Sequence, residues 1–265
     1  MSELEEFASR TSYLVPVPYL NGTITEYDMK AANISSLRYA NLIDDQTYRY
    51  LKNLPKQDRE VTIGKMLKGN PNLYYEMQKV ISYAKFQLLS KNNIPVQEVV
   101  RIANDAIYIL SDNMYSQTTI DDDGILYFAT KNRFTSMLTV CKNLLIFANT
   151  ANNGLVLDVK GINDELLFLH EPMLGFIGEL IIKIESNNTK EIISYFKDFY
   201  SRYMNRKLDL SYYRELNSDS MYRHSSGLYL TSTATDIDSI DIGFNAYILR
   251  DIWNTILHII NQYVG

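Results

Sequence analysis

Two aspartates with a basic segment between them are the residues whose types and spacing suit catalysis. Asp28 lies at the end of residues 23–29, a run rich in β-branched side chains, and Asp105 belongs to an Asn-Asp turn between two strand-like runs, 98–103 and 106–110. Two carboxylates on adjacent strands can hold two Mg²⁺ ions about 3.5–4 Å apart and so support nucleotidyl transfer. Mg²⁺ prefers oxygen ligands and keeps several waters, so such a site requires no cysteine or histidine. We therefore expect Asp28 and Asp105 to be catalytic metal ligands for Mg²⁺, or for Mn²⁺ in its place.

A basic face on the helix expected at residues 56–68 lies between the two aspartates in the sequence. Its cationic side chains are Lys56, Arg59, Lys65 and Lys68. Cations close to a metal site can neutralise the charge of an incoming triphosphate. We expect Arg59 and Lys65 to bind the substrate in this way, while a solvated helix face is the alternative that the spacing leaves open.

The elements that must position these residues follow from hydrophobic periodicity and turn residues. Residues 1–22 are interpreted as an N-terminal arm. Strands are expected at 23–29, 98–103, 106–110, 125–129, 133–140, 144–148 and 155–159, and helices at 34–54 (two, with a break near Asp44), 56–68, 72–92, 171–185, 189–207 and 245–264. The sequence therefore predicts an α+β protein, with a mixed core to about residue 160 and a largely helical C-terminal part.

Composition excludes several other kinds of site. The 265 residues include one cysteine, Cys141, so the chain has no internal disulfide and no cysteine-based zinc site. The three histidines show none of the spacings of the common histidine metal sites. A net charge of -5 argues against a wholly basic nucleic-acid coat, but it leaves room for a local basic groove.

The same composition indicates a location. No apolar run approaches the roughly 20 residues that a membrane span requires, and the acidic N-terminus lacks the features of a secretory signal. Asn, Ile and Tyr are abundant, as in proteins from AT-rich genomes, many phages among them. We therefore expect no membrane partner and a location in the cytoplasm of a bacterium or a phage-infected host.

Short segments around the two aspartates resemble the motifs of family B DNA polymerases. EYDMKAANIS (residues 26–35) is similar to motif A, Asp-x-x-Ser-Leu-Tyr-Pro-Ser, and IANDAIYI (102–109) is similar to motif C, Asp-Thr-Asp-Ser-Ile-Tyr. The basic helix occupies the place of motif B. KNRF (131–134) and DVKGI (158–162) resemble the Lys-Lys-Arg-Tyr and Lys-Gly passage that follows motif C. The order and spacing of these segments resemble a compact palm, fingers and thumb.

The resemblance implies a polymerase-like palm, an antiparallel sheet with helices, followed by a mostly helical thumb-like part. It implies template-directed nucleotidyl transfer, with nucleoside triphosphates and a primed nucleic-acid template as partners. The implied parts are an arm (1–22), a palm start (23–54), fingers-like helices (55–95), a palm sheet (96–162) and a thumb-like region (163–265).

Further site residues follow from the same resemblance. Asn33 falls at the aromatic sugar-gate position of motif A and is expected to contact the substrate. Nucleic-acid phosphates are expected to bind cationic side chains after motif C and in the thumb-like helices. These are Lys131, Arg133, Lys160, Arg202, Arg206 and Lys207.

Four departures from the polymerase pattern keep other interpretations open. Ala103 replaces the first aspartate of motif C, and Asn33 replaces the aromatic sugar-gate residue, so selection of deoxyribonucleotides over ribonucleotides stays open. The motif B signature Lys-x-x-x-Asn-Ser-x-Tyr-Gly is absent, and no exonuclease domain is expected before motif A. The chain is then a minimal palm, one subunit of a split polymerase that requires a partner subunit, or a non-catalytic palm-derived phage accessory or structural protein that binds nucleic acid or another protein. Asp28 as a helix cap and Asp105 as an ordinary turn residue in an unrelated α+β phage protein are the remaining alternative.

Overall fold

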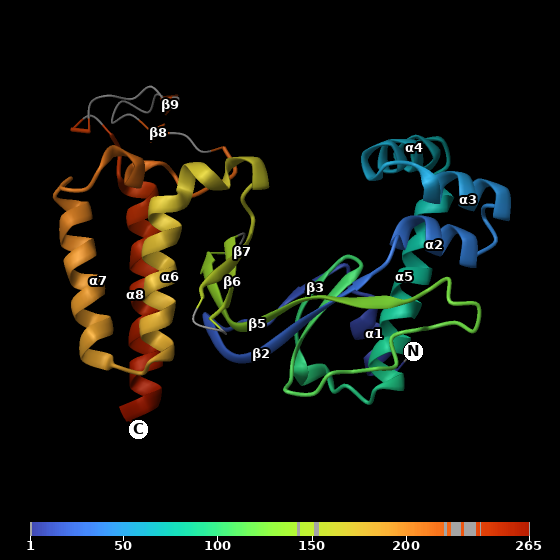
Figure 1. Ribbon diagram of the computed structural model, residues 1–265, viewed down its shortest axis with the longest axis horizontal. Helices are drawn as coiled ribbons and strands as arrows, with labels where there is room; N and C mark the ends of the chain where they lie inside the picture. The colour runs from blue at the N-terminus through green and yellow to red at the C-terminus, as the bar shows by residue number, and fades with distance from the viewer. Residues whose placement is uncertain are drawn as a thin grey trace. The chain divides into compact units, whose positions relative to one another are not determined.

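The computed structural model describes residues 2–141, 144–150, 154–219, 222–223, 229–230, 237–238 and 240–264 (Figure 1). The chain divides into two compact units, the first comprising Met1–Pro16 and Gly22–Arg133, and the second comprising Val17–Asn21 and Phe134–Gly265. Each unit has its own buried apolar core. The fold is α+β, as the sequence predicts, whereas its division into palm, fingers and thumb stays a prediction.

The first unit is organised around one long helix, α5 (Pro71–Lys91). The other elements that lie wholly within this unit are α1 (Glu3–Ala8), β1 (Ser12–Leu14), α2 (Ala32–Tyr39), α3 (Asp45–Asn53), α4 (Lys56–Gly69), a short 3₁₀ helix (Val96–Glu98), β3 (Val99–Ala103) and β4 (Ala106–Leu110). Helix α5 packs against α1, α2 and α4 (Figure 1). Its buried residues Met77, Ile81, Ala84 and Leu88 recur at helical spacing, so one stripe of this helix forms the centre of the core.

The strands of the first unit separate an apolar face from a polar one. Strand β2 (Tyr19–Met29) pairs antiparallel with β4, which pairs antiparallel with β3. Tyr27 and Met29 of β2 are buried in the α5 core. Because successive side chains of a strand point to opposite faces, Glu26 and Asp28 lie on the other face of the sheet. The strand therefore carries its two carboxylates away from the apolar core.

The second unit combines β-strands with three long helices. Its elements are β5 (Phe128–Cys141), β6 (Leu144–Asn149), β7 (Val156–Lys160), a 3₁₀ helix (Asp164–His170), α6 (Glu171–Glu185), α7 (Thr189–Met204), a 3₁₀ helix (Leu210–Tyr213), β8 (Tyr222–Arg223), β9 (Tyr229–Leu230) and α8 (Gly243–Val264). Helix α7 packs against both α6 and α8 (Figure 1), and β6 pairs antiparallel with both β5 and β7. The strand order is β1-β3-β4-β2-β5-β6-β7, and β2 and β5 each contribute residues to both units.

Two expectations about the elements differ from the structure. The segment 1–22, in which the sequence pattern predicts no helix or strand, contains α1 and β1. Helix α1 begins with a capping box in which Ser2 and Glu5 exchange hydrogen bonds, a pattern that Ser-x-x-Glu in the sequence can form. The two strands expected at 125–129 and 133–140 are one strand, β5, because no glycine or proline interrupts the chain between them.

Two glycines of α6 offer a matched test of its packing. Gly175 is exposed and has open space where a Cβ would stand, whereas a Cβ at Gly178 would lie 2.5 Å from Leu155 Cδ2 and 3.4 Å from Leu157 Cδ1. Gly175→Ala should raise the free energy of unfolding by about 1 kcal/mol, because alanine is the better helix former. Gly178→Ala should lose that gain to overpacking, which costs about 1–3 kcal/mol. Denaturant titration measures both, and equal gains would show that the contact with β7 and its preceding residue is loose.

Candidate functional site

The two predicted aspartates lie at the same end of adjacent antiparallel strands. Asp28, at the end of β2, is paired with Ala106 of β4, and the Met29 N–H donates a 3.2 Å hydrogen bond to the carbonyl of Asp105. Asn104, the first residue of the β3–β4 turn, has φ 51°, a left-handed conformation that asparagine tolerates well. The tight turn thus places Asp105 beside Asp28, although the two are far apart in the sequence.

Asp28 and Asp105 line one cavity of about 570 Å³ in the first unit. The other residues that line it are Met29, Lys30, Ala31, Ala32, Asn33, Ile34, Lys56, Arg59, Glu60, Ile63, Asn104 and Lys131. These residues come from the ends of β2 and the β3–β4 turn, the beginning of α2, helix α4 and strand β5. The cavity therefore collects carboxylates and cations from five separate parts of the unit.

The two carboxylates influence each other. Partial burial raises the pKa of the Asp105 carboxyl above its usual range, and the negative charge of Asp28 raises it further. A hydrogen bond to the backbone and the positive charges of Lys131 and Lys85 act in the opposite direction. Lys30 Nζ lies 3.8 Å from the Asp28 carboxylate. The charged form of Asp105 is therefore disfavoured unless cations are close.

The N-terminus of α2 adds partial positive charge to the cavity. Ala31, the residue before the helix, has φ 49°, which is unusual for a residue with a Cβ, and it provides no side chain to cap the helix. The backbone N–H groups of the first helical turn are left without a capping side chain and belong to residues that line the cavity. An uncapped helix N-terminus carries partial positive charge and suits a phosphate group.

Two carboxylates form the acidic part of the candidate metal site. Among the described residues, no group of three or more His, Cys, Asp or Glu side chains is arranged to hold a metal ion. Mg²⁺ is compatible with a pair of carboxylates, because it commonly takes one or two protein carboxylates and completes its shell with water and substrate phosphates. Asp28 and Asp105 fit such an ion. The ammonium of Lys30, which lies close to the Asp28 carboxylate, would compete with the ion for this carboxylate.

Comparison with known proteins identifies a phage family. Residues 8–265 match the family described as bacteriophage PBS1 gene 130 protein. The chain belongs to this family. No curated protein matches the chain. The family match supports the expected bacteriophage origin, and it adds nothing to the resemblance to family B polymerases, which stays a prediction.

The substrate residues expected from the sequence of this phage-family chain separate into two groups. Arg59 and Asn33 line the cavity. Lys65, on the same helix as Arg59, is exposed and does not line it. Lys30 and Lys56 line the cavity in its place, although the sequence pattern assigns them no role in binding substrate. Helical spacing alone does not reveal which cation of α4 faces the strand ends, because that depends on how the helix packs.

The residues expected to bind nucleic acid are divided between the units. Lys131 lines the cavity of the first unit, and Arg133 is exposed at the end of that unit. In the second unit, Lys160 forms a 2.8 Å ion pair with Asp158, and Arg202 lies 3.8 Å from Asp198. Arg206 donates a hydrogen bond to the Ile240 carbonyl. Lys207 is exposed. The half-buried Arg206 guanidinium thus has a structural partner, while the role of the set in binding nucleic acid stays a prediction.

Glu26 and Lys85 are two charged residues near the site that the sequence interpretation misses. Glu26 is 1% exposed and lies two residues before Asp28, on the same face of β2. Lys85 of α5 is also 1% exposed, and its charge lowers the pKa of Asp105. The period of two along a strand is a signal that links Glu26 to Asp28. No comparable signal links Lys85 to Asp105, because only tertiary packing brings the helix to the turn.

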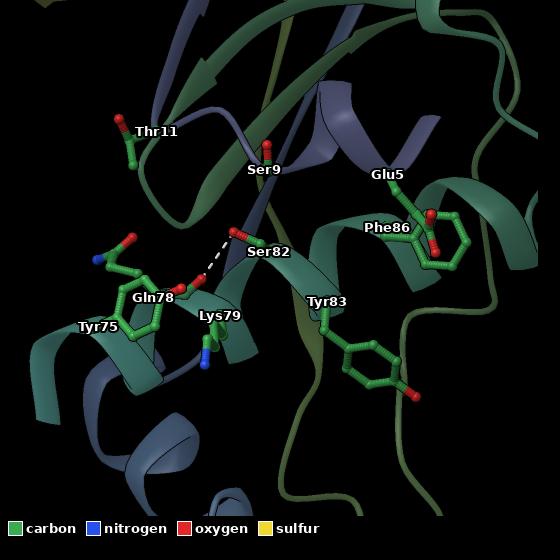
Figure 2. A pocket seen from close by; sticks show the side chains of 9 residues that line it. All are labelled: Glu5, Ser9, Thr11, Tyr75, Gln78, Lys79, Ser82, Tyr83 and Phe86. Atoms are coloured by element: carbon green, nitrogen blue, oxygen red, sulfur yellow. Dashed lines mark hydrogen bonds between the residues drawn. The ribbon is translucent and has the colours of Figure 1, made fainter. Parts of the chain in front are cut away.

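A second hollow in the first unit lies between α1 and α5 (Figure 2) and measures about 500 Å³. Aromatic side chains of α5, namely Tyr75, Tyr83 and Phe86, form much of its wall. Lys79 lies 4.3 Å from the Tyr75 ring centroid and forms a 2.7 Å ion pair with Glu76. This hollow has no pair of carboxylates among the described residues that line it, so the cavity at Asp28 and Asp105 is the better candidate for metal-dependent chemistry.

None of the described helices is long and apolar enough to span a membrane.

Proposed function

We propose that this protein catalyses template-directed nucleotidyl transfer, with a nucleoside triphosphate bound in the cavity at Asp28 and Asp105. The observation that carries the proposal is the meeting of these two carboxylates at the ends of adjacent strands, in a cavity that also contains Arg59 and the beginning of α2. Nucleotidyl transfer requires such a combination, because a metal-binding pair must lie next to groups that bind phosphate.

The triphosphate is assigned to the cationic side of the cavity. The uncapped N–H groups at the beginning of α2 provide hydrogen-bond donors for one phosphate, and the Arg59 guanidinium provides a planar pair of donors for another. Asn33 lies in the first turn of α2, where its side chain is available to the sugar or base. Lys56 also lines the cavity, where its ammonium lies 3.9 Å from the carboxylate of Glu60.

The metal is assigned to Asp28 and Asp105. Mg²⁺ or Mn²⁺ held there would activate the attacking 3′-hydroxyl and stabilise the negative charge of the leaving pyrophosphate. Asp28 and Asp105 themselves hold their negative charges close together, and Lys30 partly compensates this charge.

A non-catalytic role is the second candidate, and the cations around the aspartates favour it. Lys30 lies 3.8 Å from Asp28, and Lys131 and Lys85 act on Asp105. Ammonium groups can balance two carboxylates without a metal, and Ala103 lacks the further carboxylate that motif C would provide. In this case the protein is a phage accessory or structural protein that binds nucleic acid or a partner subunit.

A primer-extension assay tests the proposal. The purified chain is incubated with a short primed template and all four nucleoside triphosphates, in Mg²⁺ and then in Mn²⁺, beside the Asp105→Asn variant. We expect extension by the unmodified chain and none by the variant. Tight binding to the template without extension would support the accessory role or the requirement for a partner subunit. The absence of both extension and binding would overturn the nucleic-acid function.

A further inference from the structure

Glu26 is the centre of a buried polar network beside the cavity. Its side chain is 2% exposed and accepts three hydrogen bonds, from Tyr108 Oη at 2.9 Å, from Asn132 Nδ2 at 2.7 Å and from Lys131 Nζ at 3.3 Å. A buried carboxylate is tolerated when donors and an opposite charge satisfy it, as they do here. The network joins β2, β4 and β5, since each strand contributes at least one of its members.

Lys131 is the member that connects this network to the cavity. Its side chain is 47% exposed and lines the cavity together with Asp28 and Asp105, while its ammonium is paired with Glu26. An ammonium group has three donors, so the pairing with Glu26 is compatible with a further contact to a ligand in the cavity. Because lysine is long and flexible, fixing its side chain removes conformational entropy that a ligand would otherwise have to overcome.

We infer that Lys131 binds a phosphate group of the nucleoside triphosphate, and that Glu26 is the positioning residue that holds Lys131 for this contact. This inference rests on the proposed function of the cavity. The sequence predicts that Lys131 binds phosphates of the nucleic acid. The inference assigns Lys131 to the nucleotide instead, because Lys131 lines the same cavity as Arg59 and the uncapped beginning of α2. The nucleotide is therefore the expected source of the phosphate, and the backbone of a nucleic acid is the alternative source.

The negative charge of Glu26, taken without its contact to Lys131, would weaken phosphate binding in the cavity. A negative charge close to a phosphate site weakens phosphate binding, so a Glu26 that merely competed for Lys131 would make its neutral variant bind more tightly. Three donors already satisfy the Glu26 carboxylate, and their positive ends offset its negative charge. The remaining effect of Glu26 on the cavity is that it fixes the position of Lys131. The sign of the change in Glu26→Gln therefore separates positioning from competition.

A double-mutant cycle tests the inference through the affinity for each nucleoside triphosphate in the presence of Mn²⁺. Lys131→Ala should weaken binding about tenfold or more, and Glu26→Gln about threefold to tenfold, as the loss or loosening of one charge-assisted contact predicts. In the double variant, binding should be no weaker than in Lys131→Ala, because Glu26 acts through Lys131. Lys131→Arg, which keeps the charge, should restore most of the affinity. Additive effects or tighter binding by Glu26→Gln would overturn the positioning role.

Tyr108→Phe is the matched control for general damage to the network. It removes another donor to Glu26, at 2.9 Å, from a residue that does not line the cavity. Its thermal stability should fall, while its affinity for the triphosphate should remain within about twofold of the unmodified chain. An equal loss of affinity in Tyr108→Phe would show that Glu26 has only a structural role.

Two further comparisons separate this inference from the proposed function. If the unmodified chain binds no triphosphate, the proposed function and this inference both fail. If it binds and Lys131→Ala binds equally well, only this inference fails. Binding of Lys131→Ala to primed template DNA should stay within about twofold of the unmodified chain, and a loss confined to DNA would overturn the assignment of Lys131 to the nucleotide.

Discussion

Replacing Asp28 with asparagine will reduce nucleotide incorporation by about a thousandfold or more. Asparagine keeps the size of the side chain and removes the negative charge that would hold a divalent cation under the proposed function. Metal ions contribute several kcal/mol to phosphoryl-transfer transition states, and each 1.36 kcal/mol corresponds to a factor of about ten in rate. The measurement is single-turnover extension of a labelled primer in Mn²⁺. Calorimetry with Mn²⁺ should show weaker binding by the variant.

Asp122→Asn is the control for this experiment. It removes one carboxylate in the same unit at an exposed residue that does not line the cavity, so activity should not change. Wild-type activity in Asp28→Asn would show that the metal-site assignment is wrong.

Asp105→Asn should combine loss of activity with a gain in thermal stability. In the folded protein, burial and the charge of Asp28 raise the pKa of Asp105. A raised pKa means that Asp105 supports folding at low pH and that this support is lost as the pH rises through the folded pKa. At neutral pH the charged side chain therefore destabilises the fold, and asparagine removes that effect. A higher melting temperature in an inactive variant indicates a functional site, because residues held for chemistry often oppose stability.

Local sequence signals are sufficient to predict most of the elements. The Asn-Asp pair between two β-rich runs predicts the β3–β4 hairpin, since a two-residue turn requires residues that tolerate unusual backbone conformations. Pro172 near the start and Ser186 after the end predict α6 with its observed bounds. These successes rest on interactions between residues close in the sequence, where propensity and capping act directly.

The arrangement around the site depends on contacts that the sequence does not reveal. The hairpin and the alternation along β2 indicate that Asp28 and Asp105 lie at strand ends, but pairing of β2 with β4 brings together segments on either side of α5. The left-handed Ala31 has no sequence signal, because alanine is uncommon in that conformation and the surrounding structure must impose it. Distant packing thus decides which polar residues share the cavity.

Lys85 shows most clearly how packing creates an electrostatic property. Its ammonium is buried in the first unit and donates a 2.5 Å hydrogen bond to the carbonyl of Arg10. Burial lowers the pKa of Lys85 from 10.5 to about 8, although the charge of Asp105 raises it. When folding lowers the pKa of a lysine, the folded state disfavours the protonated form of that lysine. The free energy of unfolding is therefore highest above the unfolded pKa, and it decreases as the pH falls through the folded pKa.

The free energy of unfolding of the first unit should therefore rise by about 2 kcal/mol between about pH 8 and pH 10, since the unfolded chain binds a proton in this range that the folded chain has released. Lys85→Met keeps a side chain of similar length without the charge, and it should remove this rise. Denaturant titration across this range, monitored by hydrogen exchange of amides in α5, measures the effect for the first unit alone. Tyrosines whose pKa is raised by folding affect stability mainly above about pH 10, where the free energy of unfolding decreases as the pH rises. They therefore cannot cause an increase in the free energy of unfolding between about pH 8 and pH 10.

Lys79→Met is the matched control, because Lys79 lies on the same helix but is exposed and paired with Glu76. It should keep the rise between about pH 8 and pH 10. At neutral pH, Lys85→Met should also be more stable than Lys85→Ala, because both variants lose the hydrogen bond to the Arg10 carbonyl but only alanine leaves a cavity. A rise that persisted in Lys85→Met would assign the titration to another group. A rise that vanished in Lys85→Met and persisted in Lys79→Met would show that the first unit keeps a cation near Asp105 at the expense of stability, as expected if charge at this site serves binding rather than folding.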